Sequence, residues 1–330
     1  MANDFTICLG TIGGGGWHSP DGGESWRKVG WPFPSPGENQ VRSLACDPSN
    51  PHRILAGSDV GIYLSEDNGE TWEKLDSPMD GFRMWSVAFH PGDPNTLFGG
   101  ISPPGVFRTR DKGKTWEKMA IDIAPELGGF APKATAIVVD PRDHNTVWAG
   151  FEWGGVYKSL DGGDSWLQMP DPGWEPIHTD IHDIKIAIGQ QTRIYAPGPT
   201  GVFSSTDEGE SWDYHEFPKF HEGDRFSYCR AAAIKPDDPN TVFVGNGNSI
   251  PGDTGTVQRS RDGGKTWEAL TLPVKSNSNI YWIATHPSNP NRVMANSTNG
   301  YVYISEDAGD SWQKLDKEFG EIRALLWTPN

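Results

Sequence analysis

One octapeptide recurs seven times along this chain of 330 residues, and it constrains the architecture more than any other feature. Its pattern is Ser or Thr, any residue, Asp, any residue, Gly, any residue, Ser or Thr, and Trp. The copies begin at Ser19, Ser65, Thr109, Ser159, Ser205, Ser260 and Ser305. Their aspartates stand 44 to 55 residues apart, the period at which one supersecondary unit packs against the next. We therefore predict an array of seven repeated units.

The octapeptide has the composition of a hairpin turn. An Asp at a turn corner accepts backbone N–H groups, and a Gly two residues later supplies a positive φ without steric cost. The closing Trp begins the next strand with a large apolar surface. Each copy follows a short strand, such as residues 105–108, and precedes another, such as residues 115–118. We predict that it joins the third and fourth strands of a four-stranded unit, which makes its Asp and Trp structural.

A second motif recurs between the octapeptides and has the pattern of strand, turn and strand. About four apolar residues, too few for a helix, are followed by Pro, Asp or Asn and then by Val, Ile or Phe. Its copies cover residues 44–57, 87–100, 137–150, 232–245 and 283–296. We assign them to the first and second strands of the units.

The two ends of the chain supply complementary parts of one unit. Residues 5–11 have the pattern of a second strand, and residues 322–327 have the pattern of a lone first strand. A unit built from residues 1–30 and 321–330 leaves no free sheet edge. We predict one all-β domain, residues 1–330, folded as a seven-bladed β-propeller. Its blades are four-stranded and antiparallel, and the C-terminal strand closes the first blade.

The octapeptide resembles the Asp box, or BNR repeat, of sialidases, sortilin-type receptors and some endoglucanases. The chain also resembles the single seven-bladed Asp-box propellers that assist photosystem II assembly, which are non-catalytic and carry a basic patch. Sialidases have six blades and an Arg-Ile-Pro motif that is absent here, and the endoglucanases have two propeller domains. The resemblance implies a fold, whereas the function depends on a site.

Charge and leader patterns exclude some partners and compartments. The formal net charge of −16 disfavours nucleic acid and anionic membranes as partners. The octapeptides carry 15 acidic and five basic residues, so the end of the propeller opposite to them is expected to be neutral or locally basic. Without a basic leader or a long apolar run, the chain is predicted to be cytoplasmic. Cys8, Cys46 and Cys229 lack metal-ligand spacing and are predicted to be buried free thiols.

The starts of the seven innermost strands share a pattern of large polar or aromatic residues. Aligned on the following turn, this position holds Arg42, Trp85, Thr135, His182, Arg230, Tyr281 and Arg323. Two positions earlier stand Gln40, Arg83, Lys133, Asp180, Tyr228, Asn279 and Glu321. The residues between the two sets are all apolar: Val41, Met84, Ala134, Ile181, Cys229, Ile280 and Ile322. Since alternate strand residues share a face, we expect both polar sets to line the mouth of the central channel.

This position is rich in cations, which indicates an anionic ligand. The two sets contain five permanent cations, Arg42, Arg83, Lys133, Arg230 and Arg323. Guanidinium groups crowded in a cleft need an anion or neighbouring carboxylates, and Arg binds carboxylate or phosphate bidentately. The alternative is that Asp180 and Glu321 pair with these arginines and only hold the blades together.

Loops at the same end supply further candidates. Aromatic residues that could wall a pocket are Trp31, Phe33, Phe82, Phe130, Trp153 and Trp174. Residues that could do chemistry there are Glu152, Glu175, His178, His215, His221 and Asp224. The spacing of His178, Asp180 and His182 puts two imidazoles and a carboxylate at alternate positions, and His221 or Glu152 could complete a divalent metal site. Equally, Asp180 and His182 could form an acid and base pair.

Two classes of function remain. The first is a hydrolase or lyase that acts on a small anionic or acidic-sugar-like substrate in the central funnel. In that reading His182, Asp180, Tyr281 and Glu321 are catalytic. The substrate is bound by Arg42, Arg83, Trp85, Lys133, Glu152, Trp153, Tyr228, Arg230 and Arg323. The alternative is a non-catalytic scaffold that receives an acidic peptide or partner protein at the same face. A closed pocket would favour the enzyme, and a broad face would favour the scaffold.

Overall fold

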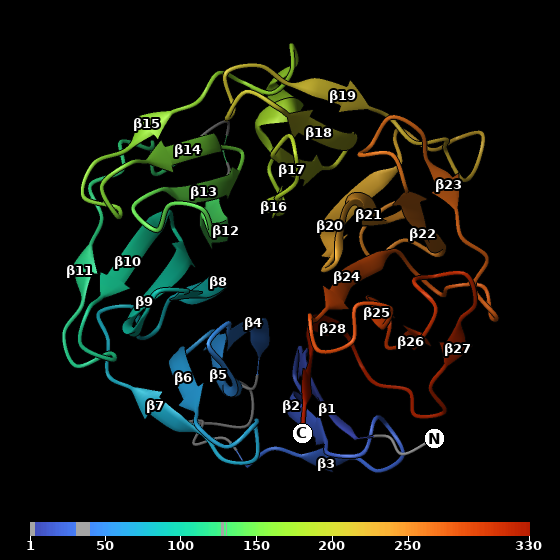
Figure 1. Ribbon diagram of the computed structural model, residues 1–330, viewed down its shortest axis with the longest axis horizontal. Helices are drawn as coiled ribbons and strands as arrows, with labels where there is room; N and C mark the ends of the chain where they lie inside the picture. Colours follow the sequence, from blue (N-terminus) through green and yellow to red (C-terminus); the bar gives the residue numbers. More distant parts are fainter. Residues whose placement is uncertain (1–3, 31–39, 127–128, 130) are drawn as a thin grey trace. The chain divides into compact units, whose positions relative to one another are not determined.

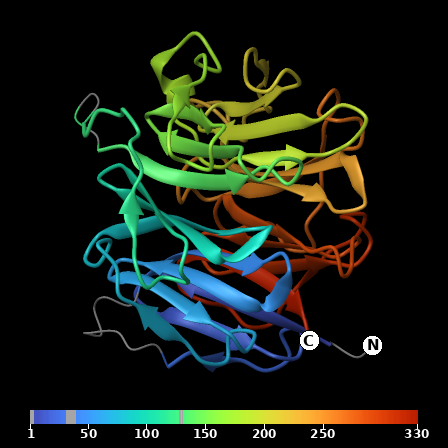
Figure 2. The same ribbon diagram turned by 60° about the vertical axis from the view of Figure 1, so that its left-hand side comes forward.

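The computed structural model describes residues 4–30, 40–126, 129 and 131–330. Within these residues the strands form seven four-stranded antiparallel sheets, the blades of a seven-bladed β-propeller (Figure 1, Figure 2). Each octapeptide lies between the third and fourth strands of its sheet. The predicted fold class and strand order are therefore confirmed.

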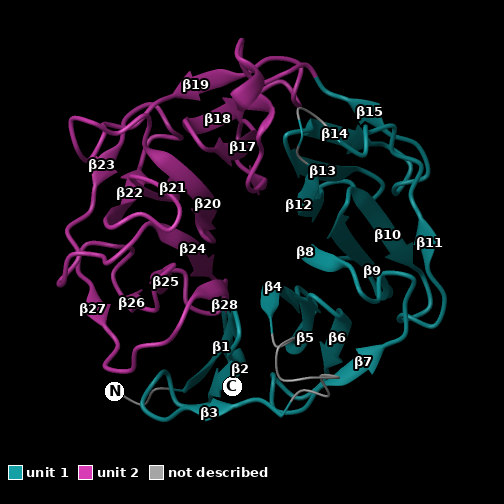
Figure 3. Ribbon diagram, turned by 180° about the vertical axis from the view of Figure 1, so that it is seen from behind, with its two compact units in different colours: residues 1–169, 326–330 teal, residues 170–325 magenta. Residues whose placement is uncertain are grey.

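The chain divides into two compact units (Figure 3). Unit 1 comprises residues 1–169 and 326–330, and unit 2 comprises residues 170–325. Each unit has apolar clusters of its own; one in unit 1 includes Leu55, Met84 and Phe107, and one in unit 2 includes Phe243 and Ile283. The expectation of a single domain stays a prediction.

Unit 1 contains strands β1 to β15 and the end of the C-terminal strand, residues 326–329, and one sheet holds both ends of the chain. Its strands, in spatial order, are β28 (Ile322–Pro329), β1 (Phe5–Thr11), β2 (Gly15–Ser19) and β3 (Arg27–Lys28). The next sheet contains β4 (Val41–Asp47), β5 (Asn50–Ser58), β6 (Gly61–Ser65) and β7 (Glu73–Leu75). Then come β8 (Arg83–His90), β9 (Asp93–Ser102), β10 (Gly105–Thr109) and β11 (Glu117–Lys118). The last contains β12 (Lys133–Val139), β13 (Val147–Glu152), β14 (Gly155–Ser159) and β15 (Leu167–Gln168).

The sheets of unit 2 follow in chain order. A short 3₁₀ helix, η2 (Pro176–Thr179), precedes them. The first sheet contains β16 (Lys185–Ala187), β17 (Arg193–Gly198), β18 (Gly201–Ser205) and β19 (Asp213–His215). The second contains β20 (Tyr228–Lys235), β21 (Asp238–Gly247), β22 (Gly255–Ser260) and β23 (Glu268–Ala269). The third contains β24 (Ile280–Thr285), β25 (Val293–Ser297), β26 (Val302–Ser305) and β27 (Gln313–Lys314).

The C-terminal strand β28 pairs with β1, as the two half-patterns predicted. Trp327 is 1 % exposed, and its ring meets that of Phe5 edge to face at 5.8 Å. The Thr6 hydroxyl donates to Asn330 Oδ1 at 2.7 Å, and Asn68 Nδ2 donates to the Pro329 carbonyl at 3.3 Å. Residues from the two chain ends thus complete one sheet, which leaves β1 without an open edge.

The octapeptide turns are held by their own side chains. In the first copy, Asp21 Oδ1 accepts from the Ser25 N–H at 2.9 Å and from the Ser19 hydroxyl at 2.8 Å. The Gly23 N–H donates to Ser19 Oγ at 2.8 Å, and Trp26 Nε1 donates to the Gly23 carbonyl at 2.9 Å. The carboxylate contacts recur in all seven copies. These residues are occupied with the turn, which supports their structural interpretation.

Hydrogen bonds of this kind favour the ionised carboxylate. The Thr115 hydroxyl and N–H lower the pKa of Asp111 to about 2, and Ser165 does the same for Asp161. In six of the seven copies the Trp indole N–H donates to the Gly carbonyl. The exception is Trp212, whose Nε1 is buried with no hydrogen-bond partner in the described part of the chain.

The apolar residues that separate the two predicted polar sets are buried completely. All seven, from Val41 to Ile322, have an exposed fraction of 0 %. In unit 1 a glycine of the second strand lies against this position in the next sheet: a Cβ on Gly100 would lie 2.8 Å from Ala134 Cβ and 2.3 Å from Ser86 Oγ. Glycine at this point lets adjacent sheets approach closely.

Cys8 and Cys229 are buried free thiols, as predicted, and Cys46 is half-buried and also free. Burial raises the pKa of Cys8 to about 12 and that of Cys46 to about 11, so these thiols are poor nucleophiles. Within the part of the chain that the structure describes, no helix is both long enough and apolar enough to cross a membrane.

Candidate functional site

A β-bulge places the residues at the start of the innermost strands. The pairing register shifts by one between Val41 and Ser43, which leaves Arg42 as the extra residue. The same shift occurs in four more sheets, where the extra residues are Trp85, Thr135, Arg230 and Tyr281. A bulge turns a side chain away from the regular alternation and is frequent beside functional sites. The sequence analysis assumed that side chains alternate regularly along these strands, and it did not predict the bulges.

Trp85 is the centre of a group of charged residues in unit 1, which we call the tryptophan cluster: Arg42, Asp59, Arg83, Trp85, Lys133 and Glu152. The Arg42 guanidinium lies 4.9 Å from the Trp85 ring centroid, and Lys133 Nζ lies 4.8 Å from it. Both distances are in the range of a cation–π contact. The Trp85 indole N–H is buried and has no hydrogen-bond partner in the described residues of this unit.

Each buried or half-buried cation of the tryptophan cluster has a carboxylate partner. Arg42 binds Asp59 with both Nε and Nη2, the second contact at 3.0 Å. Lys133 Nζ lies 2.6 Å from Glu152 Oε1. Arg83 differs, because its side chain is 66 % exposed and its contact with Asp59 is 3.9 Å. Arg42 and Lys133 are thus compensated within the cluster, and Arg83 is its exposed guanidinium.

Tyr281 is the centre of a second group, in unit 2, which we call the tyrosine cluster: Asp180, His182, Tyr228, Arg230, Tyr281, Glu321 and Arg323. The guanidinium groups of Arg230 and Arg323 lie 5.0 and 4.6 Å from the Tyr281 ring centroid. Burial alone would raise the pKa of Tyr281, but the two positive charges outweigh it and lower that pKa. Burial would also lower the pKa of Arg323, but Tyr281 and Glu321 outweigh it and raise that pKa.

His182 is held on all sides and has no open nitrogen. Its Nδ1 lies 2.6 Å from the Cys229 carbonyl, and its Nε2 lies 3.4 Å from the Tyr228 hydroxyl. Asp180 Oδ1 lies 3.3 Å from the same Nε2 without meeting hydrogen-bond geometry. His182 is 1 % exposed, and its carbonyl accepts from Arg230 Nη1 at 2.8 Å. Asp180 thus lies close to His182 as expected, but the hydrogen bonds of this buried ring go to the Cys229 carbonyl and the Tyr228 hydroxyl.

The metal site suggested by His178 and His182 is not formed in the described residues. No group of three or more His, Cys, Asp or Glu side chains there could hold a metal ion. The His178 ring packs among Trp174, Phe203 and Tyr214, and His221 contacts Asp224 at 3.5 Å. The sequence argument assumed that His178 lies on a strand with Asp180 and His182, but His178 belongs to the 3₁₀ helix η2.

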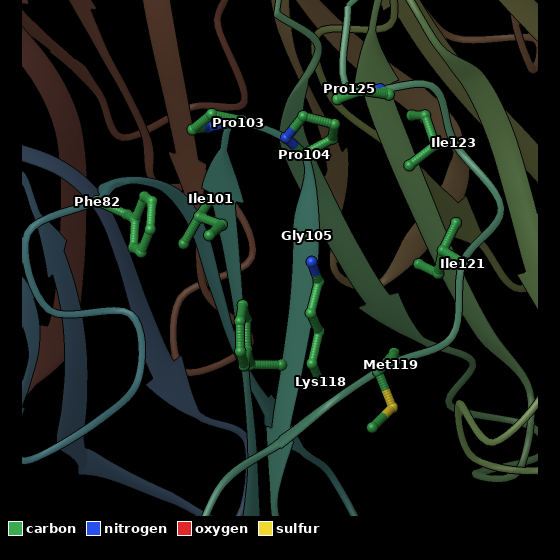
Figure 4. Close-up of a pocket in the computed structure, with 11 residues that line it drawn as sticks. Phe82, Ile101, Pro103, Pro104, Gly105, Lys118, Met119, Ile121, Ile123 and Pro125 are labelled. Carbon is green, nitrogen blue, oxygen red and sulfur yellow. The ribbon is translucent and has the colours of Figure 1, made fainter.

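Among the described residues, some surface pockets lie apart from these clusters, and three of them include candidate residues in their linings. One, in unit 1, has a volume of about 280 Å³ and a lining that is largely apolar, including Phe82, Ile101, Met119 and Ile123. Figure 4 shows side chains of the β9–β10 turn and of the segment that follows β11 around the same space. A second, of about 280 Å³ in unit 2, includes His215 in its lining.

The third pocket, the aromatic pocket, has a volume of about 200 Å³ and lies in unit 2. It is lined by Trp174, Glu175, Ile177, His178, Thr200, Tyr214, Glu216, Arg225 and Phe226. Of the loop candidates, Phe82, Trp174, Glu175, His178 and His215 thus line pockets, and Trp153 lies in the β13–β14 turn with a φ of 62°. Trp31, Phe33 and Phe130 lie outside the described residues.

Two functional contributors escaped the sequence reasoning. Asp59 lies in the turn between the second and third strands of its sheet, and Thr200 lies in the corresponding turn of another sheet. An antiparallel meander brings this turn to the end at which the first strand begins. That rule, applied to the acidic residue of each such turn, would have found Asp59 as the partner of Arg42.

Taken together, the seven four-stranded sheets define a β-propeller, and each of its two compact units contains a bulged cation–aromatic cluster. A family model described as "Sortilin, neurotensin receptor 3" matches residues 60–173 and 200–324, well over half of the chain. The chain therefore belongs to this sortilin/Vps10 family.

Among curated proteins, the chain is 32 % identical over 121 residues to the xyloglucanase Xgh74A of Acetivibrio thermocellus. This match covers 32 % of the chain but 14 % of the relative, so the chain spans a small part of that enzyme.

Among solved structures, the xyloglucanase of Xanthomonas campestris has a TM-score of 0.69 at 18 % identity, covering 94 % of this chain and 52 % of that one. YCF48 from Cyanidioschyzon merolae has a TM-score of 0.62 at 15 % identity, covering 88 % and 89 %. A structure of YCF48 bound to D1 peptide has a TM-score of 0.57 at 17 % identity, covering 83 % of this chain and 80 % of that one. At these identities the likeness shows the fold alone.

Proposed function

We propose that this protein is a binding propeller that takes up an acidic segment of a partner protein at the tryptophan cluster. The observation that carries the proposal is the pairing of an exposed guanidinium with a half-buried tryptophan. Arg83 is 66 % exposed and only weakly held by Asp59, so it can bind a carboxylate. Trp85, two residues further along the chain, adds a half-buried ring that Arg42 and Lys133 contact.

The ionic state of the tryptophan cluster favours a partner over a small resident anion. Arg42 and Lys133 already have Asp59 and Glu152 as partners, so the exposed charge of Arg83 is the one in this cluster that is left for a ligand. An open surface with one exposed cation and aromatic neighbours is typical of a protein interface, where Arg and Trp are enriched. The YCF48 structure with D1 peptide supports the proposal, since a protein of similar fold and length binds a peptide.

The burial of the tyrosine cluster argues against the roles assigned to it in catalysis. His182 is 1 %, Tyr281 2 % and Arg230 4 % exposed. A general base must lie within hydrogen-bond distance of the substrate proton. With both ring nitrogens of His182 already in contact with protein groups, this cluster serves better as internal support.

Binding of a fluorescein-labelled hexaglutamate peptide, measured by anisotropy at low and high salt, tests the proposal. We expect the parent to bind, Arg83→Ala to weaken binding several-fold, and Arg83→Glu to abolish it. Arg110→Ala is the matched control, because Arg110 is an exposed arginine of an octapeptide with a side chain 56 % exposed. Equal binding by the parent and Arg83→Glu would overturn the proposal.

A hydrolase is the second candidate, and the identity of 32 % to a xyloglucanase supports it. The release of reducing ends from xyloglucan, proportional to protein concentration, would be its signature. Glu152→Gln and Asp180→Asn variants would then show which unit carries the reaction. An absence of product at high protein concentration would remove this candidate.

A further inference from the structure

The aromatic pocket of unit 2 is independent of the tryptophan cluster and opposite to it in charge. It is formed by the start of η2, the β17–β18 turn, strand β19 with the residue after it, and the segment before β20. None of the residues in its lining belongs to the tyrosine cluster. A function for it therefore goes beyond the proposed peptide site.

The Trp174 ring of the pocket stands nearly at right angles to two neighbouring rings. The Trp174 ring meets Tyr214 at 5.9 Å with an interplanar angle of 89°, and it meets His178 at 5.1 Å with an angle of 84°. Trp174 is 77 % exposed, the largest fraction among the exposed large hydrophobic residues of the described chain. An exposed tryptophan beside a pocket is a feature of ligand sites, because its apolar surface gains from being covered.

The charges at the pocket are predominantly negative. Glu175 and Glu216 both line it, and neither carboxylate forms an ion pair within residues 170–325. Burial raises the pKa of Tyr214, and the negative charges of Glu216 and Glu175 raise it further. Arg225 is the cation of the lining, and its guanidinium lies 5.6 Å from the Phe226 ring centroid.

The floor of the pocket has a polar group without a partner. Thr200 is 9 % exposed, and its Oγ1 is buried with no hydrogen-bond partner in the described unit. The Tyr214 hydroxyl donates to the Thr200 carbonyl at 2.9 Å, which holds the tyrosine ring in the wall. A buried hydroxyl of this kind is costly unless something completes its hydrogen bonding.

We propose that the aromatic pocket binds an alkylammonium group, such as a methylated lysine side chain or a choline headgroup. The positive group lies against the face of Trp174, where the ring quadrupole attracts it, and Glu175 and Glu216 neutralise its charge. Arg225 opposes such a ligand through like-charge repulsion. A neutral sugar or an anion would instead gain from Arg225, so the sign of the effect of that residue identifies the ligand class.

Titration of the ¹⁵N-labelled protein with ammonium compounds tests the proposal. The indole N–H resonance of Trp174 is identified by its absence in Trp174→Phe. The probes are tetramethylammonium, choline and Nα-acetyl-trimethyllysine amide, and choline is matched by its neutral isostere 3,3-dimethylbutan-1-ol. Cellobiose represents neutral sugars, and sodium chloride controls for ionic strength.

The proposal requires that the ammonium probes shift the Trp174 resonance saturably and that the neutral isostere does not. Arg225→Ala tightens ammonium binding by roughly two- to fivefold, and Glu216→Gln weakens it by a similar factor. Trp174→Ala, at an exposed position, abolishes binding with unchanged thermal unfolding. Tighter binding of choline would indicate a lipid headgroup as the ligand, and tighter binding of the trimethyllysine probe would indicate a protein side chain.

Three results would overturn the proposal. These are no saturable shift with any ammonium probe, equal binding of the neutral isostere or of cellobiose, and weaker binding after Arg225→Ala. Because all of these variants lie in unit 2, hexaglutamate binding at the tryptophan cluster should stay intact in each. A loss there would indicate general misfolding.

Discussion

At the residue scale, the most unusual side chain is Tyr281, a buried phenol whose ionisation is favoured by its neighbours. Arg230 and Arg323 lie on its ring within 5.0 Å, and Glu321 pairs with Arg323. A phenol that is buried without cations has a raised pKa, as Tyr303 shows at about 12. At Tyr281 two positively charged neighbours reverse the direction of the pKa shift, so that its pKa is lowered.

Replacing Tyr281 by Phe should change the pH dependence of stability in a defined direction. The pKa of Tyr281 in the folded protein lies below the ordinary value of 10.0 that the unfolded chain retains. Its contribution to stability is therefore present above that value and is lost as the pH falls through the folded pKa. The parent should gain stability relative to Tyr281→Phe as the pH rises from neutral toward 10, measured by urea unfolding.

Tyr303→Phe is the matched control and should behave oppositely. Because the pKa of Tyr303 is raised to about 12, the unfolded chain ionises first and the parent loses stability relative to this variant above pH 10. Parallel pH curves for the two variants would contradict the assigned effect of the arginines on Tyr281.

At the scale of the element, the β-bulge is the device that builds both clusters. In five sheets it adds one residue to the start of the innermost strand, and that residue is Arg42, Trp85, Thr135, Arg230 or Tyr281. The apolar residue before it is buried completely in each of these sheets. Each bulge therefore follows an apolar anchor that packs against a neighbouring strand.

The close approach at this anchor depends on glycine in the second strand of the preceding sheet. Gly100→Ala would bring a Cβ within 2.8 Å of the Ala134 carbonyl oxygen and Cβ. We expect a loss of about 1 to 3 kcal/mol in the free energy of unfolding, since overpacking forces backbone shifts. Urea unfolding measures it.

Gly30→Ala is the control for this prediction, because a Cβ there meets nothing within 4 Å. Its effect should stay within about 0.5 kcal/mol. If Gly100→Ala were equally neutral, the sheets would not be limited by close packing at this position.

At the scale of the whole molecule, residues from opposite ends of the chain complete one sheet. Strand β28 supplies Trp327, which packs on Phe5, and the Asn330 carboxamide oxygen accepts a hydrogen bond from Thr6. These contacts join residues more than 300 positions apart in sequence, so forming them carries a loop-closure entropy cost that the packing of β28 must offset.

Trp327→Ala should destabilise the protein by about 3 to 5 kcal/mol, because it removes a fully buried ring. Trp174→Ala, at a tryptophan that is 77 % exposed, should change the free energy of unfolding by about 0.5 kcal/mol or less. Chemical unfolding of the two variants provides the comparison. A small effect of Trp327→Ala would mean that β28 contributes little to the first sheet.

The fold was predictable because its signals are local and repeated. The octapeptide specifies a turn from eight consecutive residues, since the Asp21 carboxylate accepts from Ser19 and Ser25 of the same copy. Seven copies and two complementary chain ends then determine the blade number and the strand order. The buried apolar residue near the start of each innermost strand was equally predictable, since period-two alternation needs no knowledge of distant residues.

The candidate sites were only partly predictable. The sequence placed Arg42 and Trp85 in one polar set and Lys133 in the other, but their carboxylate partners and the bulge come from pairing between strands. In the described residues His178 and His221 pack against different neighbours and no metal-ligating group of three side chains forms, so the metal hypothesis stays a prediction.

Sequence by itself determined the elements, their order and their buried faces, because those follow from local periodicity and turn chemistry. Only the tertiary structure decided which charges are neutralised, which rings are buried and which segments surround a pocket. The aromatic pocket shows the reason: Trp174, Thr200, Tyr214 and Phe226 are distant in the chain, and their meeting depends on long-range strand pairing.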